Sequence, residues 1–174
     1  MNLDQLFDRS ASRTATGFDQ TFRHRYRTTI DDLWAALTTP DRIGRWLGPV
    51  AERSADGSTY LINIGSGESL APARIVIRHC AEPTELIVDW EWQGQPAARV
   101  SATLRSIDHD QVELTLRHGG VSSESLVVGY GGGWEWCLLA LGVEAGAESW
   151  TAEQLDDHER AAQDAWRRTL EGID

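Results

Sequence analysis

The chain contains no lysine: all 16 basic residues are arginine, against 27 aspartates and glutamates. The absence of lysine excludes Schiff-base chemistry on the protein, anchoring of pyridoxal phosphate and a phosphate-binding loop that depends on lysine. The net charge of -11 opposes binding to nucleic acids and to anionic membrane surfaces, because both are negatively charged. We therefore expect no nucleic-acid partner and no membrane partner.

Cysteines and long apolar runs are also scarce. Cys80 and Cys137 have no motif spacing, so we expect two free, buried thiols rather than a disulfide. We expect no secretory signal, because the N-terminal residues lack a basic segment followed by an apolar one. The longest apolar run, from Cys137 to Leu141, is too short to span a membrane. These features predict a cytoplasmic protein.

The pattern that is present predicts many short strands between helical segments. Alternation over residues 18–27 is typical of a strand with one solvated face, and two short helices follow, capped at Thr29 and Thr39. Apolar residues at helical spacing predict a long helix that ends near Val143, and a capping box at Thr151 predicts a terminal helix. The further strands are expected at residues 51–55, 58–64, 73–80, 86–92, 99–107 and 112–118.

Four glycines fall inside the predicted long helix, at position 129 and at 131–133. Each interior glycine costs about 1 kcal/mol relative to alanine, so we expect the first half of this helix to be loose or kinked. Together with Tyr130 these glycines suggest a mobile gate, and an irregular helix start is the alternative.

Four stretches in a fixed order carry a resemblance to a known fold. They are residues 33–43, residues 45–49, residues 86–92, and residues 112–118 followed by Gly133-Trp134. In this order they resemble the helix-grip fold of the SRPBCC or START-like superfamily. Within it, the chain is similar to the homologues of the activator of the heat-shock-protein-90 ATPase. The likeness covers roughly residues 18–143. The chain lacks the basic motif of the separate chaperone-stimulating domain. The resemblance therefore does not imply that this protein stimulates a chaperone.

The resemblance implies an α+β fold. A curved antiparallel sheet of about six to seven strands would wrap around a long C-terminal helix, with two short helices after the first strand and a cavity between sheet and helix. The chain then divides into a lead-in (1–17), a helix-grip domain (18–146) and a C-terminal helical extension (147–174).

If the apolar strand faces are concave, their side chains line this cavity. The predicted ligand-binding residues are Trp46, Val88, Trp90, Trp92, Leu114, Leu116, His118, Tyr130, Trp134 and Leu138. Aromatic and aliphatic side chains of this kind accept apolar or aromatic ligands. They also fill ordinary cores, and that alternative stays open.

Few polar residues are candidates for chemistry in such a cavity. His118 and Tyr130 are the candidate catalytic residues, and His24 is a third residue worth testing. His24, His79 and His118 come from separate strands and can all face inward, but no pair of His or Cys residues has ligand spacing. The sequence thus predicts no metal site and no cofactor. Asp89, Glu91 and several arginines should occupy the outer sheet face as ion pairs.

Three functions remain open. The first is binding of a small hydrophobic or aromatic molecule in the cavity. The second is an enzyme that resembles the polyketide cyclases or dehydrases of the superfamily and uses cavity His and Tyr side chains. The third is a chaperone-associated or other protein-interaction module, with a homodimer or a protein partner held through the C-terminal helix.

Overall fold

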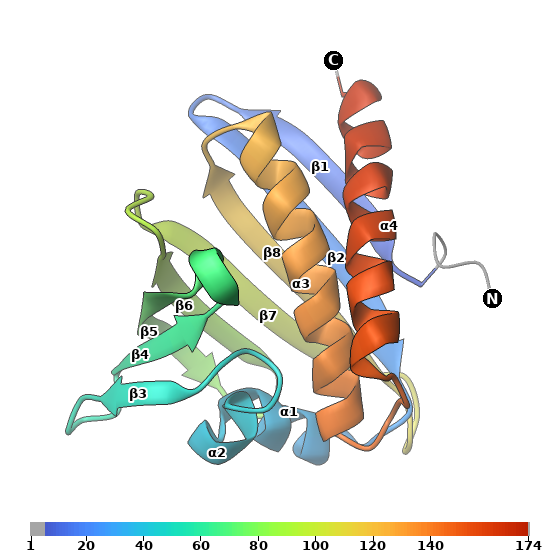
Figure 1. The fold of residues 1–174 in the computed structure, drawn as a ribbon. Helices are drawn as coiled ribbons and strands as arrows, with labels where there is room; N and C mark the ends of the chain where they lie inside the picture. Colours follow the sequence, from blue (N-terminus) through green and yellow to red (C-terminus); the bar gives the residue numbers. More distant parts are fainter. Residues whose placement is uncertain (1–5, 174) are drawn as a thin grey trace.

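The computed structural model describes residues 6–173, in which a curved antiparallel sheet carries two long helices on its concave side (Figure 1). The strands are β1 Asp8–Thr14, β2 Gly17–Tyr26, β3 Val50–Arg53, β4 Thr59–Ile64, β5 Ala71–Ala81, β6 Glu85–Glu91, β7 Ala98–Ser106 and β8 Val112–Val121. The helices are α1 Ile30–Thr38, α2 Pro40–Ile43, α3 Glu124–Glu144 and α4 Ala152–Glu171, with a short 3-10 helix at Gly67–Ser69. The strands pair in the order β1-β2-β8-β7-β6-β5-β4-β3. This arrangement confirms the predicted helix-grip fold, with eight strands rather than six or seven.

The additional strand is β1, which the sequence analysis assigned to the lead-in. Its residues include no large apolar side chain, so there was no alternation to detect. The strand forms because it pairs along its whole length with β2, from Asp8 opposite Arg23 to Thr14 opposite Gly17. A Cβ atom at Gly17 would lie 2.3 Å from the carbonyl oxygen of Val121, so the hairpin turn needs a glycine there.

Two buried side chains of β2 hold α3 against the sheet. The Tyr26 hydroxyl donates a hydrogen bond to the carbonyl of Leu138 at 2.9 Å, and the Gln20 amide donates one to the carbonyl of Val127 at 2.8 Å. The start of α3 is fixed by Ser123, whose side chain accepts a hydrogen bond from the Leu126 amide, as a helix cap does. These hydrogen bonds fix the position of α3 against the sheet and the residue at which the helix begins.

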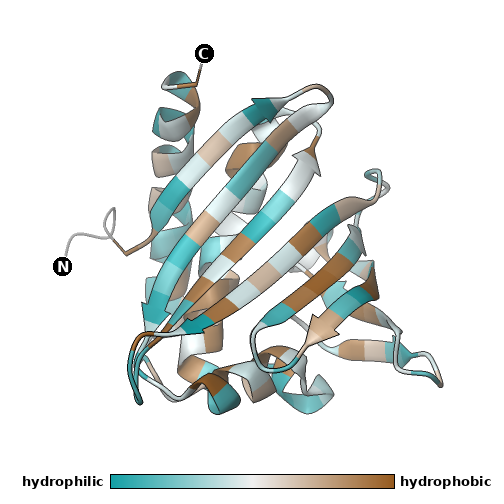
Figure 2. Ribbon diagram, turned by 180° about the vertical axis from the view of Figure 1, so that it is seen from behind, coloured by the Kyte–Doolittle hydropathy of each residue, from teal (hydrophilic) through white to brown (hydrophobic). Residues whose placement is uncertain are grey.

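The outer face of the sheet carries ion pairs, as predicted. Hydrophilic and hydrophobic residues alternate along the strands seen from behind in Figure 2. Asp89 of β6 pairs with Arg78 at 2.6 Å and with Arg99 at 2.8 Å, and Glu113 of β8 pairs with Arg105 at 2.9 Å and Arg25 at 3.0 Å. Each of these two carboxylates is paired with two arginines, so ion pairing across the strands explains both.

The glycines of α3 serve helix packing. A Cβ atom at Gly131 would lie 2.4 Å from the Trp166 ring of α4, and one at Gly132 would lie 2.7 Å from Gln163. Gly129 and Gly133 meet no described atom within 4 Å. The expected kink is not found, because α3 is continuous from residue 124 to 144 and α4 packs directly along it.

Helix α3 also has the length and apolar composition of a membrane span. In this fold it is the core helix, and more than half of its most apolar stretch is buried. Both cysteines are free, as expected. The expectation that both are buried is wrong, because Cys80 is exposed near the end of β5 and Cys137 of α3 is half-buried.

Candidate ligand-binding site

A small pocket lies between the sheet and the first turns of α3. Four aromatic side chains line it: Trp90 of β6, Trp92 just beyond that strand, His118 of β8 and Tyr130 of α3. The remaining wall comes from the β6–β7 loop, the first residue of β7, the end of β8 and the start of α3. The pocket encloses about 10 Å³, close to the space that one water molecule occupies.

The protonation state of His118 is set by its neighbour on α3. The indole Nε1–H of Trp134 donates a hydrogen bond to His118 Nδ1 at 3.0 Å. An indole nitrogen only donates, so Nδ1 is unprotonated and the proton of the neutral ring is on Nε2. Burial lowers the pKa of His118 to about 4, so the ring is neutral at physiological pH.

Two polar atoms of this site have no hydrogen-bond partner among residues 6–173. They are Nε2 of His118 and Nε1 of Trp90, and their side chains are 1% and 4% exposed. Both nitrogens carry a hydrogen and therefore need an acceptor. A buried donor without a partner costs about 1–3 kcal/mol, so such atoms in native proteins call for an explanation.

Aromatic rings surround these two donors. The Tyr130 ring lies 4.7 Å from the His118 ring between centroids, and the Trp134 ring lies 5.1 Å from that of Trp90. The Trp92 and Tyr130 rings are 6.1 Å apart. Burial raises the pKa of Tyr130, which keeps its phenol neutral. The site is thus aromatic and uncharged at neutral pH.

The β6–β7 loop forms one wall of the pocket. Gln95 and Pro96 of this loop line the pocket, and the Ser122 hydroxyl donates a long hydrogen bond of 3.4 Å to Gln95 Oε1. The loop turns through two residues with positive φ, Gln93 at 51° and Gly94 at 69°. Only the second of these has the residue type that adopts this conformation without cost.

The ten predicted site residues fall into three places. Trp90, Trp92, His118 and Tyr130 line the pocket, and Trp134 contacts two of them from the side. Val88, Leu114, Leu116 and Leu138 are buried in the core. Trp46 is also buried, and its indole donates a hydrogen bond to the Ala36 carbonyl at 2.9 Å.

The β6–β7 loop and residues 120–122 also line the pocket but were not predicted, because their polar and glycine-containing sequence carries no periodic signal.

The three strand histidines do not share a site. His24 bonds to the Leu6 carbonyl at 2.8 Å and to Glu148 at 2.5 Å. It pairs in register with Leu114, four residues along β8 from His118. The expectation that His79 can face inward is wrong: a bulge between residues 77 and 79 turns it outward, and it pairs with Glu85 at 3.3 Å.

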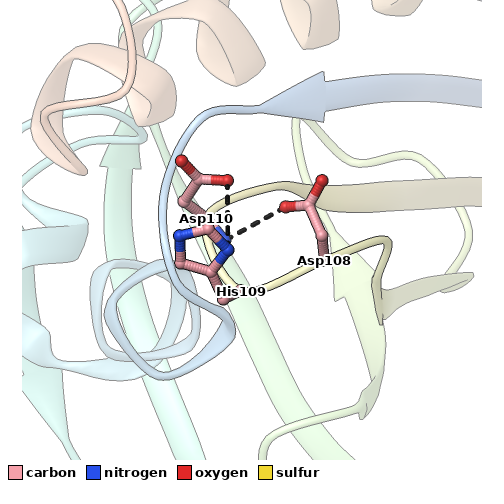
Figure 3. A group of neighbouring side chains, drawn as sticks. All are labelled: Asp108, His109 and Asp110. Atoms are coloured by element: carbon pink, nitrogen blue, oxygen red, sulfur yellow. Dashed lines mark hydrogen bonds and ion pairs between the residues drawn. The ribbon is translucent and has the colours of Figure 1, made fainter.

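One cluster within the described chain has ligand atoms close enough for a metal ion. Figure 3 shows Asp108, His109 and Asp110 in the turn between β7 and β8. All three are exposed, and Asp108 accepts a hydrogen bond from the Asp110 amide at 3.1 Å, as turn aspartates do. The cluster is explained by the turn.

A second buried polar cluster lies on the α4 side of α3. Glu135 is fully buried and accepts two hydrogen bonds from Arg9 at 2.5 and 2.7 Å, one from His158 at 2.8 Å and one from the Trp166 indole at 2.9 Å. Burial alone would raise the pKa of Glu135, but the bonds from His158 and Arg9 outweigh burial and lower it. The sequence analysis missed this cluster, because Arg9 is far from Glu135 along the chain.

These features define a helix-grip protein with a small aromatic pocket under its long helix. Residues 27–174 match the family described as activator of Hsp90 ATPase homolog 1-like protein, so the chain belongs to this family. The match includes α4. No curated protein matches the chain.

Three solved structures illustrate the fold. The crystal structure of CalU16 from Micromonospora echinospora superposes with a TM-score of 0.72 at 27% identity, over 95% of this chain and 99% of that one. DynU16, a protein in the dynemicin biosynthetic locus, gives 0.60 at 21% identity over 79% and 59%. The Aha1 dimer from Colwellia psychrerythraea gives 0.55 at 14% identity over 75% and 96%. The last two likenesses concern the fold alone.

Proposed function

We propose that this protein binds a small aromatic or hydrophobic molecule in the pocket between β6, β8 and the start of α3. The observation that carries the proposal is the pair of buried polar atoms, on His118 and Trp90, that lack partners in one aromatic pocket. Elsewhere α3 is fixed to the sheet by the hydrogen bonds of the Tyr26 hydroxyl and the Gln20 amide. Gln20 Oε1 and His158 Nδ1 are the other buried side-chain atoms without a partner among the described residues, and neither residue lines the pocket. A binding site explains why this part of the interface is left incomplete.

Entry of a ligand requires the pocket to open. A volume of about 10 Å³ is smaller than any aromatic molecule, so a wall has to move. The β6–β7 loop is joined to residue 122 by a hydrogen bond between Ser122 and Gln95 that is long, at 3.4 Å, and therefore weak. We infer that this loop swings outward and that the aromatic rings separate to admit the ligand.

An acid–base enzyme of the polyketide cyclase or dehydrase type has less support. A general base needs a free lone pair, and that of His118 Nδ1 is engaged by Trp134. The low pKa of His118 and the raised pKa of Tyr130 leave both groups neutral, so neither is poised to exchange a proton near pH 7.

A protein-interaction role through α4 also has less support. The apolar face of α4, which includes Leu155, Ala162 and Trp166, is already buried within the fold. Its exposed face carries ion pairs such as that between Arg160 and Asp157. Dimerisation and a cytoplasmic location stay predictions.

The proposal is tested by filling the pocket. Ala98 of β7 lines it, whereas the adjacent Ala97 is exposed. We expect native mass spectrometry of gently purified protein to show an added small mass that is lost on denaturation, and indane to bind to ligand-free protein. Ala98→Phe should abolish both, because the new ring occupies the pocket.

Ala97→Phe is the matched control, since it adds the same ring one residue away on the surface. Retained binding is expected for this variant. The proposal fails if the wild-type protein carries no small molecule and does not bind indane, or if Ala98→Phe binds as well as the control does.

A further inference from the structure

The two unpartnered atoms of the pocket have the same polarity, and this polarity restricts the ligand. Because Trp134 occupies His118 Nδ1, the free nitrogen Nε2 carries a hydrogen. The free nitrogen of Trp90 carries a hydrogen in every state of an indole. The Trp90 and His118 rings meet edge to face, with centroids 6.4 Å apart. The two neighbouring rings that carry these N–H donors thus line one pocket.

The pocket offers no charge to match these donors. No arginine, aspartate or glutamate lines it in the described chain. A carboxylate or phosphate ligand would be buried there without a counter-ion, which is costly. A neutral acceptor, such as a carbonyl oxygen, satisfies both donors without this penalty.

We propose that the pocket recognises a small aromatic carbonyl compound, whose oxygen accepts hydrogen bonds from His118 Nε2–H and Trp90 Nε1–H. This inference rests on the proposed function and names the chemistry of its ligand. Tyr130 and Trp92 supply flat faces against which the ring of such a compound stacks. His118 then acts as a neutral hydrogen-bond donor, with Trp134 as the positioning residue that fixes its tautomer.

One buried acceptor nearby requires consideration. Gln20 lies opposite His118 on β2, and its Oε1 also lacks a partner within residues 6–173. Gln20 is not among the residues that line the pocket, and its amide nitrogen is held by the Val127 carbonyl. A ligand that donates a hydrogen bond to Gln20 would therefore have to reach past the pocket wall.

The inference is tested with three bicyclic probes of similar shape. Indane has a CH₂ group where 1-indanone has a carbonyl and indoline has an N–H. Two neutral hydrogen bonds of ordinary strength predict that 1-indanone binds about tenfold more tightly than indane. In ¹⁵N–¹H spectra, the indole N–H signal of Trp90 should move downfield with 1-indanone and not with indane. Trp90→Phe assigns that signal.

Variants separate the two donors. Trp90→Phe and His118→Leu should each reduce the preference for 1-indanone over indane to about threefold. His118→Gln should retain it, because its amide can accept from Trp134 and still donate into the pocket. Trp136→Phe is the control: its indole bonds to Asp156 at 3.0 Å, outside the pocket. If His118→Leu fails to fold, Trp90→Phe and the indole shift still decide the matter.

The possible outcomes are distinct. Equal binding of indane and 1-indanone would overturn this inference and leave the proposed function intact. Tighter binding of indoline, lost in Gln20→Leu, would overturn it in favour of a hydrogen-bond-donating ligand. Failure of all three probes to bind would contradict the proposed function itself.

Discussion

The two sides of helix α3 treat buried polar groups differently. Towards α4, the Glu135 carboxylate is paired by Arg9, His158 and Trp166 with four hydrogen bonds. Towards β6 and β8, a ring nitrogen of His118 and the indole nitrogen of Trp90 lack partners among the described residues. His158 Nδ1, on the α4 side, also lacks a partner there, although the other nitrogen of that ring is bonded to Glu135. Trp134 and Glu135 are adjacent in sequence but point to these two different sides of α3, because successive helix residues point about 100° apart.

This difference suggests that the two sides of α3 have different roles. A paired buried carboxylate has what it needs within the protein, so the Glu135 cluster is explained by its role in docking α4 and β1. An unpaired donor leaves free energy unrecovered until an acceptor arrives. We infer that the first side of α3 is built for stability and the second for binding. The predictions below test that division.

Removing the carboxylate should have the largest effect. Glu135→Ala removes the carboxylate that pairs with the Arg9 guanidinium, which is 7% exposed, and leaves the buried His158 and Trp166 N–H groups without this acceptor. Breaking a buried ion pair in this way costs about 3–5 kcal/mol of unfolding free energy. Urea denaturation measures the change. Glu124→Ala, on the same helix, removes an exposed pair with Arg13 and should cost less than about 1 kcal/mol. Similar losses in both variants would remove the basis for a stabilising role.

The α3–α4 contact that encloses this cluster should be the next most sensitive. Gly131→Ala places a methyl group 2.4 Å from the Trp166 ring, which has no room to move, since it is fully buried. We expect a loss of about 3 kcal/mol from overpacking. Gly133→Ala meets nothing within 4 Å and should stabilise the helix by up to about 1 kcal/mol. Thermal and urea unfolding would show opposite signs for the two variants.

On the side of α3 that faces β6 and β8, the pH dependence of the unfolding free energy should report the lowered pKa of His118. Its pKa is about 4 in the folded protein and about 6.5 in the unfolded chain, so the unfolded state takes up the proton first as the pH falls. Stability is unaffected above pH 7 and declines as the pH falls from 6.5 towards 4. The loss should reach about 2 kcal/mol at pH 5.

His118→Gln should lack this part of the pH dependence. The measurement is urea unfolding of both proteins at pH 7.5, 6 and 5. Parallel curves for wild type and variant would assign the decline to other groups and would contradict the neutral buried state of His118.

Most of the fold was predictable because its elements are marked locally. Capping residues such as Thr29 and Thr151 fixed helix starts, and alternation fixed the strands. Strand β1 was not predictable, because it is held by backbone pairing with β2 rather than by apolar side chains. The glycines of α3 misled for a related reason: their effect depends on Trp166, which lies far along the chain.

The aromatic residues of the candidate site were predictable from the sequence. Which of their polar atoms lack hydrogen-bond partners was not. Alternation brought Trp90 and His118 to one face, but no sequence pattern shows that Trp134 occupies one histidine nitrogen and leaves the other free. The same holds for Glu135, whose partners come from β1 and α4. Pairing of buried polar atoms is a property of tertiary structure, and it is also the property on which the proposed function rests.

The smallest minimum effect is expected when the same substitution, tryptophan to phenylalanine, is made on each side of α3. Trp166→Phe and Trp90→Phe each remove an indole N–H from a nearly fully buried ring, so their losses of packing should be similar. Trp166 also loses a hydrogen bond to a carboxylate, which is worth about 1.5 kcal/mol at the lower end because Glu135 keeps its other donors. Trp90 loses no hydrogen bond and sheds an unpaired donor. Trp166→Phe should therefore be the less stable variant by at least about 1.5 kcal/mol in urea unfolding, because relief of the unpaired Trp90 donor adds to the difference. Equal stabilities would mean that Trp90 is paired in solution, and the two sides of α3 would then not differ.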